Sequence, residues 1–295
     1  METLFSRRAG GSKGPFLTGC LTAFMETIMD WLGLITPVLL MTLLGIPHGA
    51  LDGYIIKAMS KNIADLIVLF SCYVLVVVLS ISSWLLYPTI SILGFLAISM
   101  IHFGRSDLST QSCAHPFLAI IARGGLWVIA LPLLQWQHTE IIFAHLQTNT
   151  AVVKNALGIA IVPWILACGF YLCSQLGRGQ RRMCAEWLIG LLTILLLPPL
   201  WAICVYFCGW HARRHTAKVV AYSTSRMSAI RDMRVFTGFT LIIAGVLYLL
   251  YFRQVAAEPA VITVFFVGLF AITVPHMILI DVYLPRRQEH WRIQP

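Results

Sequence analysis

Charged side chains are scarce in this sequence. Of its 295 residues, 21 are Lys or Arg and 12 are Asp or Glu, so that 11% are charged and 59% are hydrophobic. Ordinary soluble domains carry about 25% charged residues. A soluble globule of this length needs a larger polar shell than these residues supply. The composition therefore excludes that class and favours a chain whose outer surface faces lipid.

The sequence also lacks CxxC pairs and a basic face of the kind that binds nucleic acid. The eight cysteines form no CxxC pair, and most lie in or beside apolar runs, where Cys behaves as a small hydrophobe. A disulfide framework is therefore not expected. The net charge of +9 is not accompanied by a basic face interleaved with aromatic residues, which single-stranded nucleic acid needs. We expect no nucleic-acid partner, and expect membrane lipid to surround the chain.

Several apolar runs approach or exceed the roughly 20 residues with which a helix crosses a bilayer. They predict an all-α, polytopic transmembrane helical bundle of about nine spans. The expected spans are residues 31–52, 65–87, 90–104, 117–135, 156–176, 183–197, 200–220, 235–252 and 260–284. The bundle as a whole is expected over 29–285. Residues 1–28 are predicted to be a disordered or interfacial extension, and residues 286–295 a cytoplasmic tail.

The number of spans depends on Pro198-Pro199. The apolar run around this pair is too long for one crossing, and the residue before a proline resists helix. Splitting the run there gives nine spans, whereas treating the pair as a kink gives eight. With nine, most Lys and Arg residues fall on one side, which the positive-inside rule makes cytoplasmic. The chain is therefore expected to be multi-pass, with its C-terminus in the cytoplasm.

Five of the nine histidines lie in or at the end of apolar spans, and the nine-span arrangement places all five near the cytoplasmic side. They are His48, His102, His211, His215 and His276. Ionisable groups at such positions are costly and usually face the interior of the bundle. A single histidine there is more often a hydrogen-bonded contact between helices than a ligand. Five that converge on one layer favour a metal site.

His211 and His215 are four residues apart, so on a helix they project from one face and can bind one metal. With His48 and His102 they predict a four-imidazole site, and imidazole suits Fe, Zn, Cu and Ni. Asp52, Asp107 and Asp281 follow histidines by four or five residues and are interpreted as acceptors that hold ring tautomers.

Glycines and aromatic residues near these histidines allow two interpretations each. Gly45, Gly49 and Gly53 are typical either of close helix packing or of backbone approached by a substrate. The aromatic residues either pack ordinarily or line a hydrophobic tunnel. They are Phe103, Trp201, Tyr206, Phe207, Trp210 and Phe270.

Four segments together resemble the Brp/Blh family of bacterial and archaeal membrane β-carotene 15,15′-dioxygenases. These segments are PHGALD at 47–52, HFG at 102–104, WHxxRH at 210–215 and PHM at 275–277. The resemblance spans most of the expected bundle. It implies central cleavage of β-carotene by O2 into two molecules of retinal, with a functional link to a retinal-binding rhodopsin. It also implies a prokaryotic inner (plasma) membrane as the location.

The resemblance also implies the cofactor, Fe(2+), and the roles of individual residues. His48, His102, His211 and His215 would be the iron ligands and the catalytic residues. His276, Asp52, Asp281, Phe103 and Trp210 would lie behind the ligands or against the substrate.

Three other functions compete with this interpretation. A desaturase or hydroxylase of the di-iron type needs roughly twice as many ligands and HxxHH clusters, which the sequence lacks. A metal or proton transporter needs intramembrane carboxylates along a whole path, whereas the polar residues here gather near one face. A carotenoid or retinal chaperone without turnover would share the apolar site and is distinguished by its failure to form retinal.

Overall fold

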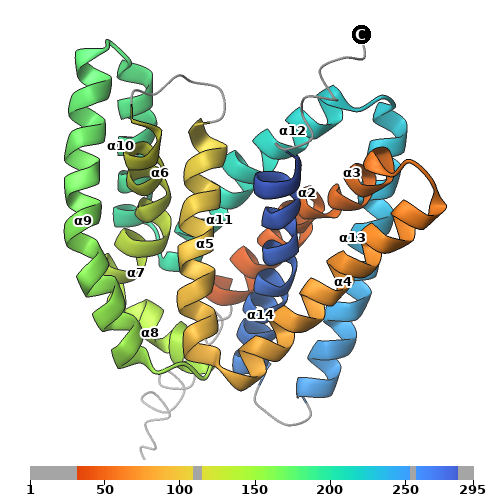
Figure 1. Cartoon of the computed structure of the whole chain (residues 1–295). Coiled ribbons are helices and arrows are strands. Elements are labelled where there is room, and N and C mark those ends of the chain that lie inside the picture. Colours follow the sequence, from red (N-terminus) through yellow and green to blue (C-terminus); the bar gives the residue numbers. More distant parts are fainter. Residues whose placement is uncertain (1–31, 109–114, 253–256, 285–295) are drawn as a thin grey trace, which may run out of the picture.

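The structure is a computed structural model that describes residues 32–108, 115–252 and 257–284. Within these ranges all regular secondary structure is helical, and the predicted all-α polytopic bundle is confirmed (Figure 1). The expected extension at 1–28 and the expected tail at 286–295 lie outside the described residues.

The chain runs as antiparallel helical rods joined by short connections (Figure 1). The first rod, Leu32–Met59, contains the π-helix η1 (Met41–Gly45), α2 (Ile46–Ala50) and α3 (Asp52–Met59). After it come α4 (Ile63–Leu86) and α5 (Pro88–Leu108), then a rod made of α6 (Pro116–Gly125), η2 (Leu126–Ala130) and α7 (Leu131–Leu134), and the short α8 (Trp136–His145). Next are α9 (Thr150–Gly177) and α10 (Arg181–Leu196), and a rod of α11 (Pro199–Tyr206), η3 (Phe207–Ala212) and α12 (Arg213–Tyr222). The last are α13 (Arg226–Phe252), α14 (Ala257–Met277) and η4 (Ile278–Tyr283).

The predicted break at Pro198-Pro199 is confirmed, because α10 ends at Leu196 and α11 begins at Pro199. Within the described ranges, seven helical rods are long and apolar enough to cross a membrane. The 16-residue α10 and the rod from α11 to α12 are the other two segments that the sequence predicts as spans. The number of crossings stays a prediction.

Several helices extend beyond the apolar runs that predicted them. The run predicted at 235–252 lies in α13, which already begins at Arg226, and the run at 156–176 lies in α9, which begins at Thr150. At α9 the side chain of Asn149 accepts a hydrogen bond from the backbone N–H of Val152, 3.1 Å away. This cap starts the helix in polar sequence. The predicted spans lie within these helices, because an apolar run marks the part of a helix in hydrocarbon and not its ends.

Two glycines bring α5 and α6 into backbone contact. A Cβ placed on Gly104 would lie 2.3 Å from the carbonyl oxygen of Ile120, and one on Gly124 would lie 1.9 Å from that of Met100. Small residues allow this close approach of helices in membrane proteins. The contact fixes the height of α5 in the bundle. Against the other side of α5 packs α14, which also contacts α2, α4, α8 and α13.

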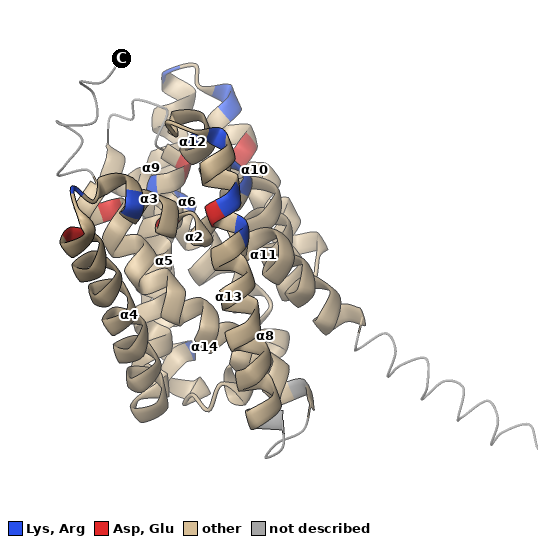
Figure 2. Ribbon diagram, turned by 90° about the vertical axis from the view of Figure 1, so that its right-hand side faces the viewer, with Lys and Arg blue, Asp and Glu red and all other residues tan. Residues whose placement is uncertain are grey.

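Charged residues gather at one end of the bundle. Figure 2 shows most of the Lys, Arg, Asp and Glu residues near α3, α12 and the start of α10, while the remaining length of the rods is almost free of charge. This asymmetry is the one that the positive-inside rule associates with the cytoplasmic face.

Candidate metal centre

Five histidines from different helices meet inside the bundle near its charged end. His48 lies on α2, His102 on α5, His211 on η3, His215 on α12 and His276 on α14. His48, His102, His211 and His276 are buried, and the Nε2 atom of the half-buried His215 is buried too. Sequence segments far apart in the chain are therefore brought to a single place.

The five rings are close neighbours. Their centroids lie 4.9 Å apart for His102 and His211, 5.2 Å for His102 and His276, 5.2 Å for His215 and His276, 5.3 Å for His48 and His211, 5.3 Å for His48 and His276, and 5.7 Å for His48 and His215. In each pair one ring presents its edge to the other, with interplanar angles between 71° and 87°.

Three of the rings are held through Nδ1 by an oxygen acceptor. His276 Nδ1 lies 2.8 Å from Asp52 Oδ1, and His102 Nδ1 lies 2.8 Å from Asp281 Oδ2. His48 Nδ1 bonds to the carbonyl oxygen of Gly45. Because carbonyl and carboxylate oxygens accept hydrogen bonds, the proton belongs on Nδ1. The Nε2 atom of each ring then presents a lone pair.

Most of the Nε2 atoms have no partner. Those of His102, His211, His215 and His276 are buried without a hydrogen bond to any described residue. Each such atom costs about 1 to 3 kcal/mol when left unsatisfied. Four of them cost about 4 to 12 kcal/mol together, which is comparable with the whole stability of a typical domain. Such a cluster of buried lone pairs indicates a ligand that accepts them, and a cation does.

The spacing of the rings fits one metal ion. Among the described residues, no group of three or more His, Cys, Asp or Glu side chains is already arranged so that it could hold a metal ion. However, a metal–nitrogen bond of about 2.1 Å puts a ring centroid about 3.2 Å from the ion, and ligands about 90 to 120° apart then have centroids about 4.5 to 5.5 Å apart. Five of the six observed spacings, 4.9 to 5.3 Å, fall in this range, and the sixth, 5.7 Å between His48 and His215, lies just above it.

Comparison with known proteins shows which family the chain belongs to. Residues 39–283 match the family model described as "Beta-carotene 15,15'-dioxygenase". The chain belongs to the β-carotene 15,15′-dioxygenase family.

Two curated relatives place the chain within this dioxygenase family. It is 33% identical over 262 residues to a "Beta-carotene 15,15'-dioxygenase" of uncultured marine bacterium 66A03, with 86% of this chain and 94% of that protein covered. It is 26% identical over 227 residues to a "Probable beta-carotene 15,15'-dioxygenase Blh" of Halobacterium salinarum, with 63% of this chain and 62% of that protein covered. No solved structure matches the chain.

Two carboxylates of this family member hold histidines on other helices and not the histidines that precede them in the sequence. Asp52 follows His48 by four residues but bonds to His276, while Asp281 follows His276 by five residues but bonds to His102. Each carboxylate thus ties its own helix to another one. The sequence spacing could not show this, because it records only neighbours on the same helix.

Asp107 holds none of the five rings. It accepts a hydrogen bond from the Tyr206 hydroxyl at 3.4 Å and lies 3.7 Å from the guanidinium of Arg123. The interpretation of Asp107 as a tautomer-holding acceptor was therefore wrong. An Arg in the middle of a membrane helix costs about 2.5 to 3.5 kcal/mol on insertion scales. Pairing with Arg123 explains why a carboxylate is retained at this position.

Two residues that sequence analysis did not single out support the carboxylates. The Tyr73 hydroxyl donates to Asp52 at 3.0 Å, and the Arg105 guanidinium pairs with Asp281 at 3.4 Å. Such outer partners orient the rings of a metal site. No sequence motif marks Tyr73. Arg105 carries a weak signal, because it follows His102 by three residues.

The expected aromatic residues divide into two groups. Phe103 and Phe207 lie against the histidines, with centroids 5.0 Å from His211 and 5.1 Å from His48, respectively. Trp210 instead contacts Arg214, whose guanidinium carbon lies 3.9 Å from the centroid of the Trp210 ring. Gly45 is needed for packing, because a Cβ there would lie 2.2 Å from the Phe207 ring.

Three π-helical segments surround the cluster. η1 ends shortly before His48, η3 contains His211, and η4 contains Asp281. Single π-helical turns are rare and are found frequently at functional sites. The wider turn changes the direction of the side chains that follow it. Its placement beside His48, His211 and Asp281 therefore supports a functional role for these segments.

Proposed function

We propose that this protein cleaves β-carotene at its central 15,15′ double bond, with O2, into two molecules of retinal. The metal in this proposal is Fe(2+), with His48, His102, His211 and His215 as ligands and His276 as a fifth. The observation that carries the proposal is the cluster of buried imidazoles with free Nε2 atoms in a chain of the β-carotene 15,15′-dioxygenase family.

The reaction balances without a further reactant. One C=C bond breaks, each of its two carbons gains one oxygen atom of O2, and two aldehydes result, so neither a reductant nor a proton donor is needed. Bound iron would supply the oxygen chemistry, and the five imidazoles would hold it, because imidazole is a ligand that suits iron. The residues of the chain supply orientation and the exclusion of water.

The protein's own contribution is orientation and exclusion of water. Asp52 and Asp281 keep the Nδ1 protons of His276 and His102 in place, and Gly45 does so for His48. These partners fix the direction in which each Nε2 points. Phe103 and Phe207 cover the rings with apolar surface. Both carboxylates are engaged with histidines, which agrees with a reaction that uses no general acid or base.

The place of the site in the membrane suits the substrate. β-Carotene is a long apolar molecule that dissolves in the bilayer, and the cluster lies among helices long enough to span it. We further propose that the protein lies in a prokaryotic inner membrane with its C-terminus in the cytoplasm, and that the retinal it forms serves a retinal-binding rhodopsin.

Removal of the metal tests the proposed function. The protein is purified in detergent, treated with an iron chelator and assayed for retinal from β-carotene under air. We expect retinal formation to stop and to return when Fe(2+), but not Zn(2+), is added. Unchanged turnover by iron-free protein would disprove the role of iron. Absence of retinal from fully iron-loaded protein would disprove the reaction and favour a carotenoid-binding protein.

A further inference from the structure

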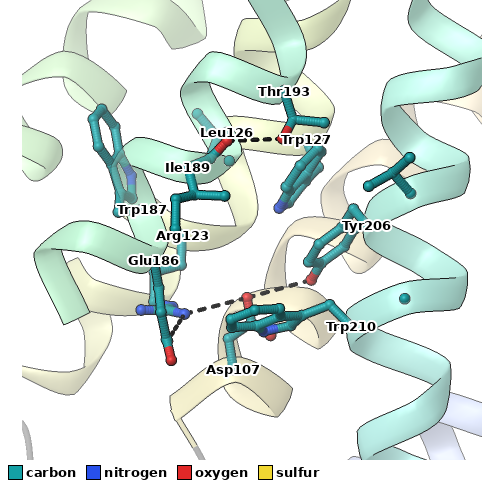
Figure 3. Close-up of a pocket in the computed structure, with 13 residues that line it drawn as sticks. Asp107, Arg123, Leu126, Trp127, Glu186, Trp187, Ile189, Thr193, Tyr206 and Trp210 are labelled. Atoms are coloured by element: carbon teal, nitrogen blue, oxygen red, sulfur yellow. Dashed lines mark hydrogen bonds and ion pairs between the residues drawn. The ribbon is translucent and has the colours of Figure 1, made fainter. Parts of the chain in front are cut away.

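A cavity lies beside the histidine cluster, between α10 and the rod of α11 and η3. Its volume is about 210 Å³, and helices α5 and α6 and segment η2 form its inner wall (Figure 3). Pockets that enclose a whole drug-sized molecule measure about 300 to 1,000 Å³. This cavity therefore has room for part of a long molecule and not for all of it.

The cavity opens toward the lipid-facing side of the bundle. Ile189 on α10 and Val205 on α11 line it, and both side chains are exposed on the outer surface. Other exposed residues of α10 are aliphatic too, among them Leu188 and Leu192, which do not line the cavity. A molecule dissolved in the bilayer can thus reach the opening without passing through water.

Flat aromatic rings form much of the wall. Trp127 and Tyr206 are stacked with their centroids 4.0 Å apart, and Trp187 and Trp210 also line the cavity (Figure 3). Aromatic faces of this kind give dispersion contacts to a flat, conjugated hydrocarbon without requiring polar groups from it.

The charged residues of the wall neutralise one another. The guanidinium of Arg123 lies 3.2 Å from Glu186 and 3.7 Å from Asp107 (Figure 3). Glu186 also pairs with Arg214 at 3.3 Å. These ion pairs leave no carboxylate of the wall without a cationic partner, so the cavity is not suited to a free cation. An apolar occupant fits it better.

Tyr206 connects this cavity to the metal centre. Its ring lines the cavity and lies 5.2 Å from Phe103 and 6.2 Å from His211, measured between ring centroids. Phe103 is itself 5.0 Å from His211. A chain-like molecule that ends in the cavity would therefore pass along these aromatic side chains to the histidines.

We propose that β-carotene enters sideways from the bilayer between α10 and α11, and that one end of it rests in this cavity while its centre lies at the histidines. This proposal rests on the proposed function and adds to it a route of access and a binding place for one end group. The occupant is an apolar polyene end, held by the aromatic wall rather than by hydrogen bonds.

Bulky substitutions at the opening test the proposal. Ile189→Trp and Val205→Trp place an indole at the opening from its two sides. Leu192→Trp is the matched control, because Leu192 lies on the same helix, is 54% exposed against 58% for Ile189, and does not line the cavity. The assay is retinal formation from β-carotene in detergent or lipid vesicles, expressed per bound iron so that loss of folded protein does not enter the comparison.

We expect kcat/KM per bound iron to fall about tenfold or more in Ile189→Trp and Val205→Trp, and to stay within about twofold of the parent protein in Leu192→Trp. Equal values for all three variants would overturn the lateral route while retinal formation by the parent protein persists. If the parent protein with full iron forms no retinal, the proposed function fails instead, so the two failures can be told apart.

Discussion

Replacing any one of His48, His102, His211 and His215 with alanine should abolish retinal formation. Each substitution removes one imidazole from the proposed first shell. Loss of a residue behind the ligands typically costs 10- to 100-fold in metal affinity or activity, so loss of a ligand should exceed about 100-fold. Retinal production and iron content of each purified variant are the quantities to measure.

His138→Ala is the control for these four substitutions, because His138 lies on α8 with an exposed side chain. It should keep both the iron and the activity of the parent protein. A variant of the four that formed retinal at a near-normal rate would remove its histidine from the ligand set.

His276→Ala is expected to be as damaging as the other four substitutions. The sequence placed His276 behind the ligands or against the substrate. In the structure its ring centroid lies 5.2 Å from those of His102 and His215 and 5.3 Å from that of His48, and its Nε2 is free. Its position is thus equivalent to theirs, and the variant should lose iron as well as activity.

Substitutions of Asp52 should cause a smaller loss of activity than His276→Ala. Asp52→Ala removes the acceptor for His276 Nδ1 and should lower activity about 10- to 100-fold. Asp52→Asn keeps an oxygen acceptor and should lose less. If His276→Ala kept its iron and lost only turnover, His276 would be a substrate-side residue, as the sequence alone had suggested.

Much of the architecture could be predicted because lipid imposes simple rules. Long apolar runs mark the helices, and the break at Pro198-Pro199 is confirmed since proline disturbs the helix before it. Helix ends were less predictable: α13 continues out to Arg226 in polar sequence. The short α8 was also missed, because its ten residues cannot span a bilayer.

The site was predictable as a set of residues but not as a set of contacts. Histidines inside apolar runs are costly, so their presence alone indicated that they gather in the interior. Which carboxylate holds which ring depends on the rotation of packed helices, and periodicity within one helix does not give that rotation. This is why the sequence could not show that Asp52 holds His276, that Asp281 holds His102, or that Asp107 pairs with Arg123.

The nature and position of the cavity were not predictable. Its aromatic lining comes from η2, α10, α11 and η3, and Trp127 lies far in sequence from Tyr206, on which it stacks. The sequence indicated that aromatic residues such as Phe103, Tyr206 and Trp210 either line a tunnel or pack ordinarily. Only the packing shows that Tyr206 stands between the cavity and His211.

X-ray absorption at the iron K-edge of the purified, Fe(2+)-loaded protein tests most directly whether imidazoles from distant parts of the chain surround a single ion. We predict one iron per chain, nitrogen neighbours at about 2.1 Å, and outer-shell scattering from four or five imidazole rings. Iron–iron scattering, sulfur neighbours or fewer than four imidazoles would contradict this account.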